Sequence, residues 1–244
     1  MAKKDENFKT PFKVTIWTSS HGLASHFFPQ SLKKKFDEQP RTKISMPTIN
    51  ARGGRIMCEN FVTEYLKDFE KIKDSKEPRI TILLMGDNNL RKYALKGCFW
   101  NYKFSLEILE AHRGTCHPLL ILGLMPSPRT HDVTIPLAEY MDDFFQETIL
   151  DLYERYKNES RFFAFTNSSS FFSDKRGNLL HLKYFTNDGV HLNQKGAEKL
   201  AKRILQNAEL MVDSVLYRIS NSVLKPPDNK NGLKKILPSE TDTN

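Results

Sequence analysis

Three short polar clusters contain side chains that together could transfer an acyl group. The clusters are residues 18–22, 86–89 and 188–193. Ser20 offers a hydroxyl nucleophile, and the side-chain amide of Asn88 could donate a hydrogen bond to an oxyanion. His191 offers a base, and Asp188, three residues earlier, offers the carboxylate that orients it. The clusters therefore contain every component that acyl transfer requires.

Each of these residues also has an ordinary structural explanation. Ser20 could cap a following helix, and Asn88 could belong to a turn. Asp188 begins a common turn dipeptide, and Asn193 could be the N-cap of the last helix. Ser19 is the alternative nucleophile, one residue earlier in the chain. Taken one at a time, the structural explanations outweigh the catalytic ones.

The rest of the chain alternates between short apolar runs and longer amphipathic stretches. The apolar runs predict strands at residues 12–17, 43–46 (the weakest), 79–85, 118–125 and 161–165. Apolar residues at helical spacing predict helices at residues 57–73, 91–112, 135–157 and 194–219. This alternation predicts an α/β fold: a three-layer α/β/α sandwich with a five-stranded parallel sheet. Ligands of such sheets bind at the carboxyl ends of the strands, and the three polar clusters fall there.

The chain has 244 residues, enough for one large domain or two small ones. No break in composition divides residues 11–220, which we therefore assign to a single domain. Residues 1–10 are predicted to be a flexible N-terminus. Residues 221–244 are polar and contain adjacent prolines, a composition that predicts a disordered tail.

Composition restricts the classes of site and compartment. The three cysteines, Cys58, Cys98 and Cys116, form no CxxC pair, so we expect neither a disulfide framework nor a metal site. The N-terminus lacks the apolar segment of a signal peptide, and no apolar run is long enough to span a membrane. The chain is expected to be intracellular, in the cytoplasm or the nucleus. Six further histidines, His21 and His26 among them, are expected at the surface or in local hydrogen bonds.

The polar clusters resemble, in order and spacing, the sequence blocks of the SGNH (GDSL-like) hydrolase family. Residues 188–193, Asp-Gly-Val-His-Leu-Asn, followed by Lys-Gly at 195–196, resemble the last block and are the most specific signal. Residues 86–89 resemble the Gly-x-Asn-Asp block. Residues 52–54, Arg-Gly-Gly, resemble the block that supplies a backbone N–H donor, and residues 18–20 align with Gly-Asp-Ser.

This resemblance covers nearly the whole chain and implies the flavodoxin-like SGNH hydrolase fold. It implies a catalytic triad of Ser20, Asp188 and His191. It also implies an oxyanion hole made by the backbone N–H groups of Gly54 and Ser20 and by the amide of Asn88. The implied activity is that of a metal-free serine esterase, without a cofactor, acting on short acyl esters. The acyl group and the oligomeric state are not specified by the sequence.

The sequence departs from the family pattern at three positions. Thr18 stands where the family has glycine, and Ser19 and Asn89 stand where it has aspartate. A β-branched residue tolerates fewer backbone angles than glycine, and a hydroxyl is a weaker acceptor than a carboxylate. Both changes fall in the nucleophile turn, so they keep open the alternative of a catalytically inactive SGNH-like module.

The alternative module would bind RNA or another polyanion. The C-terminal domain of the insect germ-plasm organiser Oskar resembles SGNH hydrolases and binds RNA, and SGNH domains also occur in the first open reading frame of certain retrotransposons. The formal net charge of +8, from 37 Lys and Arg against 29 Asp and Glu, suits such a partner. Its candidate binding residues are Lys33, Lys34, Lys35, Arg91 and Lys92, which could equally form solvated helix faces.

Overall fold

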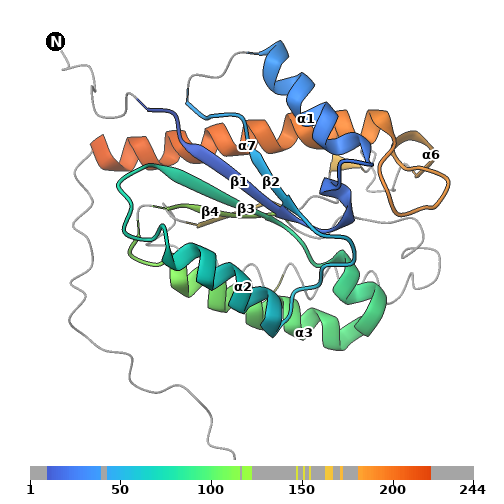
Figure 1. Ribbon diagram of the computed structural model, residues 1–244, viewed down its shortest axis with the longest axis horizontal. Coiled ribbons are helices and arrows are strands. Elements are labelled where there is room, and N and C mark those ends of the chain that lie inside the picture. The colour runs from blue at the N-terminus through green and yellow to red at the C-terminus, as the bar shows by residue number, and fades with distance from the viewer. Residues whose placement is uncertain are drawn as a thin grey trace, which may run out of the picture.

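The central layer of the protein is a parallel five-stranded sheet with the order β2-β1-β3-β4-β5 (Figure 1). The computed structural model describes residues 10–39, 43–115, 117–122, 163–166, 171–172 and 181–220, together with residues 147, 151 and 154. The strands are β1 (Lys13–Thr18), β2 (Thr48–Ala51), β3 (Arg79–Leu84), β4 (Leu119–Leu122) and β5 (Phe163–Thr166). Because the strands are parallel, their carboxyl ends lie at one edge of the sheet.

Helices cover both faces of the sheet (Figure 1). Helices α1 (Phe27–Glu38) and α7 (Gln194–Ser220) pack together on one face. Helices α2 (Glu59–Glu70) and α3 (Asp87–His112) pack together on the other. Two short elements lie near the carboxyl ends of the strands: the 3₁₀ helix η1 (Ser20–Gly22) and α6 (His181–Tyr184). The predicted three-layer α/β/α sandwich is confirmed.

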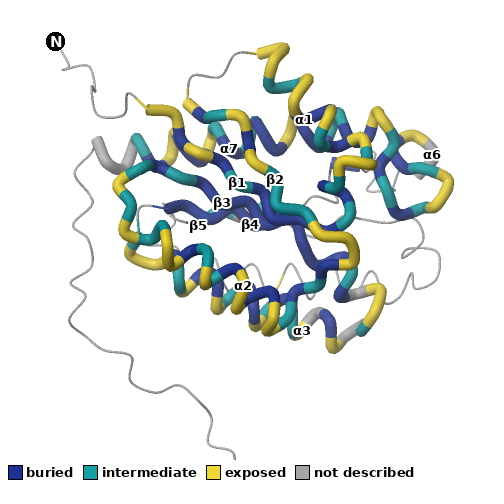
Figure 2. The backbone as a smooth tube through the Cα atoms, viewed as in Figure 1, coloured by how far each residue is buried: buried dark blue, intermediate teal, exposed yellow. Residues whose placement is uncertain are grey.

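Two apolar cores separate the sheet from its helical layers, and the strands alternate between them. On β3, Ile80 and Ile82 belong to the core under α1 and α7, whereas Leu83 belongs to the core under α2 and α3. This alternation follows from the two-residue period of a strand, since both faces of a parallel sheet are covered. Figure 2 shows the result as a buried central layer between helices whose outer sides are exposed.

The structure corrects the predicted position of the second strand. Residues 43–46 do not form it: Ile44 makes only an isolated bridge to Phe12, and the strand lies at Thr48–Ala51. Pro47 has no N–H to donate, so the pairing of Ile44 with the first strand stops before it. Helix α1 was not assigned from the sequence, although Phe28 and Leu32, one turn apart, bury its inner face.

Other boundaries differ by a few residues. Helix α3 begins at Asp87, four residues before the predicted start, so the second polar cluster forms its first turn. Most of the predicted helix at 135–157, and the tails at 1–9 and 221–244, lie outside the described residues. In the described part of the chain, no helix is long and apolar enough to cross a membrane.

Candidate active site

Ser20, His191 and Asp188 form a continuous chain of contacts at the carboxyl edge of the sheet. Ser20 Oγ lies 2.8 Å from His191 Nε2. His191 Nδ1 lies 2.5 Å from Asp188 Oδ2. Ser20 comes from η1, directly after β1, whereas the other two come from the loop before α7. The fold thus joins side chains that are 171 residues apart in the sequence.

A compact loop holds the Asp188 carboxylate. Oδ1 of Asp188 accepts hydrogen bonds from the Thr186 hydroxyl (2.6 Å) and from the backbone N–H groups of Val190 (2.8 Å) and His191 (2.9 Å). Gly189 closes the turn at φ +66°, a backbone conformation that favours glycine. Burial alone would raise the pKa of Asp188, but these donors and the His191 ring outweigh it and hold the pKa well below its usual range.

Asn193 connects this loop to α7. Its backbone N–H donates to the carbonyl of Tyr184, and its side-chain oxygen accepts from the N–H of Gly196, at 3.0 Å. This is the N-cap role that the sequence suggested. A Cβ on Gly196 would lie 2.2 Å from the Tyr184 oxygen, so the start of α7 requires glycine there.

Ser19 and Ser20 point to different partners. The Ser19 hydroxyl is fully buried and donates to Asp87 Oδ1 at 3.3 Å, at the start of α3. Ser20 is half-buried and reaches His191. Helix α1 begins after His26 without a side-chain cap, so capping by Ser20 is not its role. Of the two serines, only Ser20 has the contacts of a candidate nucleophile.

Thr18 fits at the end of β1 because Gly22 leaves room for its methyl group. Thr18 is fully buried. A Cβ placed on Gly22 would lie 2.2 Å from Thr18 Cγ2 and 2.9 Å from both Ala51 Cβ and Ile49 Cγ2. The bulk at residue 18 is therefore accommodated by a glycine four residues later.

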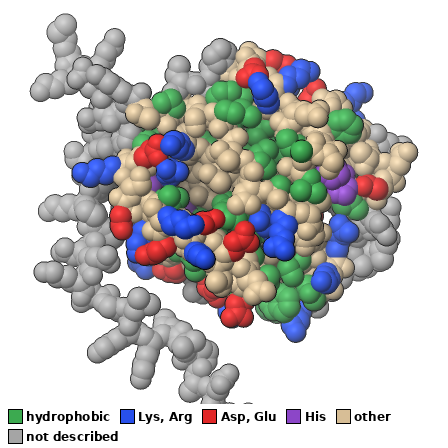
Figure 3. All heavy atoms as spheres, in the orientation of Figure 1, with side chains coloured by type: hydrophobic (Ala, Val, Ile, Leu, Met, Phe, Trp, Pro, Cys, Tyr) green, Lys and Arg blue, Asp and Glu red, His purple; other side chains and the backbone are tan. Residues whose placement is uncertain are grey.

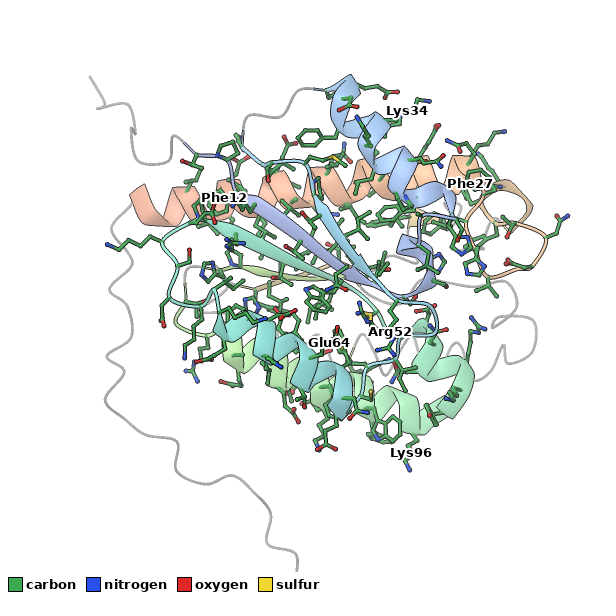
Figure 4. All side chains as sticks on the ribbon, in the orientation of Figure 1. Phe12, Phe27, Lys34, Arg52, Glu64 and Lys96 are labelled. Carbon is green, nitrogen blue, oxygen red and sulfur yellow. The ribbon has the colours of Figure 1, made fainter. Side chains whose placement is uncertain are left out.

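Asn88 and Gly54 lie where the loop after β2 meets the start of α3. Asn88 donates one amide hydrogen to the carbonyl oxygen of Arg55 at 3.1 Å, which leaves its second amide hydrogen for a ligand. Gly54 is exposed at φ +66°, with no heavy atom within 4 Å of the position of a Cβ. Figure 4 shows the neighbouring Arg52 close to this end of the sheet.

Asn89 fixes the same loop. Its buried amide accepts from the Met57 N–H and donates to the Met57 carbonyl, both at 2.7 Å. A carboxylate could make only the first of these bonds, because it has no hydrogen to donate. The departure of Asn89 from the family aspartate therefore gives the loop a second hydrogen bond.

Arg55, which the sequence did not single out, joins the ends of β1 and β2. Its buried guanidinium donates to the Asn50 backbone at 2.8 Å and to the Asn50 side chain at 3.0 Å. It also lies over the Trp17 ring, 5.1 Å from the centroid. Its guanidinium also donates to the Thr18 carbonyl at 3.4 Å, across 37 residues of sequence, a contact that a local pattern could not reveal.

Two further histidines surround His191. His21 is buried, with Nε2 3.9 Å from Asp87 Oδ2, so the expectation of a surface position is wrong for this residue. Burial lowers the pKa of His21 to about 4, although Asp87 opposes the shift. His26 stacks on the His191 ring, with centroids 4.1 Å apart.

The basic residues proposed for polyanion binding fall into two groups. On α1, Lys33 pairs with Asp37, Lys34 with Glu198 and Lys35 with Glu38, at 2.5, 3.2 and 2.6 Å. On α3, Arg91 donates to the Asn88 side chain at 3.4 Å, and Lys92 lies over the Tyr93 ring. Figure 4 shows Lys34 and Lys96 on helices at opposite sides of the sheet. In Figure 3, acidic and basic side chains intermix on the visible face.

The described residues contain no group of three or more His, Cys, Asp or Glu side chains that could hold a metal ion. The arrangement around Ser20 contains a hydroxyl, an imidazole and an ionised carboxylate in consecutive contact. These are the groups that acyl transfer uses.

No family model matches the chain, and no curated protein matches it in sequence. A GDSL-like lipase from Bacteroides thetaiotaomicron superposes with a TM-score of 0.59 at 13% identity, over 81% of this chain and 88% of the lipase. A lipase from a goat rumen metagenome gives 0.59 at 16% identity, over 80% and 96%. A proposed SGNH hydrolase from Slackia heliotrinireducens gives 0.58 at 13% identity, over 82% and 100%.

These likenesses extend over most of each chain, and the matched proteins share one architecture. Sequence identities this low support a shared fold but do not show a shared activity. They agree with the resemblance that the polar clusters carry in the sequence. The protein has the fold of the GDSL-like lipases and SGNH hydrolases.

Proposed function

We propose that the protein is a serine esterase of the SGNH type that hydrolyses short acyl esters. The contact chain from Ser20 through His191 to Asp188 is the observation that carries this proposal. A purely structural role of Ser20 would not explain why His191 lies 2.8 Å from its hydroxyl while the other ring nitrogen of His191 contacts a carboxylate. The structural similarity to two lipases is consistent with the hydrolysis of esters.

The charge on Asp188 determines which nitrogen of His191 carries the proton. Because its lowered pKa keeps the carboxylate ionised, Asp188 can only accept a hydrogen bond, so the proton belongs on Nδ1. Nε2 is then a free base facing Ser20 Oγ. As Oγ forms its bond to the ester carbonyl carbon, Nε2 takes the hydroxyl proton.

The carbonyl oxygen becomes an oxyanion in this step and needs hydrogen-bond donors. The proposed donors are the backbone N–H groups of Ser20 and Gly54 and the second amide hydrogen of Asn88. Arg55 supports this role, because its carbonyl fixes the orientation of the Asn88 amide. A donor of this kind typically contributes about 3 kcal/mol to transition-state stabilisation.

His191 then returns the proton to the alkoxide oxygen of the leaving group, and the carbon–oxygen bond of the ester breaks. An acyl ester of Ser20 and a free alcohol result. In the second half of the reaction His191 removes a proton from water, and the water oxygen attacks the acyl carbon. The acid leaves, and the Ser20 hydroxyl regains its proton from His191.

Hydrolysis of an aryl acetate by the wild type and two serine variants tests this proposal. Imidazole alone cleaves such esters slowly, so the comparison of the variants is what decides. Ser20→Ala is expected to lower kcat by about a thousandfold or more. Ser19→Ala is the matched control and should keep most of the rate, because its hydroxyl binds Asp87. A Ser20→Ala protein with wild-type turnover would rule out the esterase.

Binding of RNA or another polyanion is the second candidate function, and the outer face of α3 favours it. Arg91, Lys92, Lys96 and Lys103 are exposed there. Among the described residues, none of the four forms an ion pair with an acidic side chain. The α1 lysines are each neutralised by such a pair, so α3 is the better candidate surface.

Fluorescence polarisation with single-stranded RNA at several salt concentrations tests the second candidate. The double substitution Lys92→Glu and Lys96→Glu should weaken binding and make its salt dependence shallower, because fewer phosphates are neutralised. Lys33→Glu with Lys34→Glu changes the net charge equally and serves as the control. Undetectable or salt-independent binding by the wild type would reject this function.

A further inference from the structure

His26 lies face to face with His191, the base of the proposed esterase. The two ring centroids are 4.1 Å apart and the ring planes are inclined by 14°. His26 belongs to the short loop between η1 and α1, where its backbone N–H donates to the carbonyl of Leu23 at 2.9 Å. The imidazole of His26 takes no part in the reaction proposed above, so its contact with His191 requires a separate explanation.

The hydrogen bonds of His191 leave one movement of its ring weakly restrained. Ser20 contacts Nε2 and Asp188 contacts Nδ1, so the two contacts define a line through the ring. Tilting of the ring about that line changes both distances little. A flat side chain packed against one face of the ring opposes this tilt, and the parallel imidazole of His26 has that position.

The charge on His26 also matters, because its neighbours are titratable. His191 and Asp188 face it from the loop before α7, and His21 lies nearby in η1. Burial lowers the pKa of His26 and the proximity of His191 lowers it further, while Asp188 opposes both. Since the pKa of His21 is also lowered, to about 4, both additional imidazoles are neutral at neutral pH.

Neutral and protonated His26 would have opposite effects on the reaction. During acyl transfer His191 becomes an imidazolium, and a neutral aromatic face stacked on it attracts the positive charge. A protonated His26 would repel it at the same distance. The rate should therefore depend on His26 through both the shape and the charge of its ring.

We infer that His26 is a positioning residue: its ring, stacked on His191, holds the imidazole plane and favours the protonated state that His191 adopts during acyl transfer. This inference rests on the proposed esterase function. It assigns a role in the reaction to His26, which is neither the nucleophile, the base, the carboxylate nor an oxyanion donor.

Three substitutions separate shape from charge. His26→Ala removes the stacked ring and is expected to lower kcat by about tenfold with little change in KM, because it affects the base and not substrate binding. His26→Phe keeps a flat ring and should recover most of that loss. His26→Lys places a permanent charge near His191 and should be slower than His26→Ala. Phe27→Ala is the control, since Phe27 is the next residue and lies exposed at the start of α1 (Figure 4).

The pH profile gives a readout that a merely structural role would not change. Protonation of His26 should lower wild-type activity at acid pH, because its charge then repels the imidazolium that His191 becomes during acyl transfer. The His26→Phe variant lacks this titratable group, so it should keep a larger fraction of its own maximal rate on the acid side. Identical normalised profiles for the two proteins would contradict the role of charge.

An NMR titration tests the stacking of His26 on His191 without a measurement of catalytic activity. The pKa of His26 should rise towards its ordinary value in a His191→Gln variant, because part of the burial and the nearby His191 ring, which both lower that pKa, are removed. An unchanged pKa would overturn the pairing. Ester hydrolysis that needs Ser20 but is indifferent to His26→Ala would overturn this inference alone, whereas hydrolysis indifferent to Ser20→Ala would overturn the proposed function.

Discussion

Thr18 and Ser19 alter the turn that contains the proposed nucleophile, and each is accommodated by another residue of this chain. The methyl group of Thr18 occupies space that Gly22 leaves open. The hydroxyl of Ser19 donates to Asp87, so a carboxylate from the next strand end stands beside the position where the family has its own. The glycine and the carboxylate missing from residues 18 and 19 are therefore present nearby.

Substitution of Gly22 tests the first of these compensations. Gly22→Ala would place a Cβ within 2.2 Å of the Thr18 methyl group, so the end of β1 or η1 must shift. We expect a loss of roughly 1–3 kcal/mol in the free energy of unfolding, measured by urea denaturation. Adding Thr18→Ser removes that methyl group and should restore part of the loss. Equal stability of the single and double variants would contradict the compensation.

His21 should make the protein less stable in acid. Above its ordinary pKa of 6.5 His21 is neutral in both states, but between 6.5 and about 4 the unfolded chain binds a proton that the folded protein does not. The free energy of unfolding should therefore fall over this range, by at most about 3 kcal/mol from this residue. Urea denaturation of the wild type and His21→Gln between neutral pH and about pH 4.5 measures the difference. Parallel pH dependences would show that burial of His21 has no such effect.

Among the helices and strands, those with a clear apolar pattern in their own residues were predicted from the sequence. The apolar runs of β3 and β4 are buried on both faces and were assigned in place. Strand β2 has no such run, because Thr48–Ala51 is only partly buried, and it was placed too early. In α1 the run of lysines obscured the apolar positions, whose inner face packs against α7.

The candidate site shows the same division between local and distant information. The spacing of Asp188 and His191 is local, and the loop that orients them was expected from the sequence. The partnerships of Ser19 with Asp87 and of His26 with His191 depend on which strand ends become neighbours. No periodicity or composition encodes that information for a single chain.

The hydrogen bonds between Asn89 and Met57 connect the start of α3 to the loop after β2, and a substitution at Asn89 tests how much they stabilise that loop. Asn89→Asp introduces the residue of the SGNH block that this segment resembles, yet it should destabilise this protein, because the carboxylate cannot donate to the buried Met57 carbonyl. A loss of about 1–3 kcal/mol in the free energy of unfolding is expected. Because Gly54 belongs to this loop, kcat for an ester should fall as well. A fully stable and active Asn89→Asp protein would contradict the account of the loop.

At the scale of the whole molecule, the buried apolar side chains that the structure describes in both cores lie between Phe12 and Val215. The polar composition of residues 221–244 predicts that they add little to either core. Deleting residues 226–244 should therefore change Tm by no more than about two degrees in a thermal melt. A larger fall in Tm would mean that the apolar pair Ile236 and Leu237 packs against the domain.

The whole-molecule fold serves the site by bringing the ends of β1, β3 and the loop before α7 together. We propose that this arrangement activates one serine. Labelling with a fluorophosphonate, followed by peptide mass spectrometry, tests this activation, because the reagent bonds to a serine whose proton a neighbouring base removes. The predicted result is a single adduct on Ser20 that is absent from Ser20→Ala and strongly reduced in His191→Ala. An adduct on Ser19, or none on the folded wild-type protein, would contradict the account.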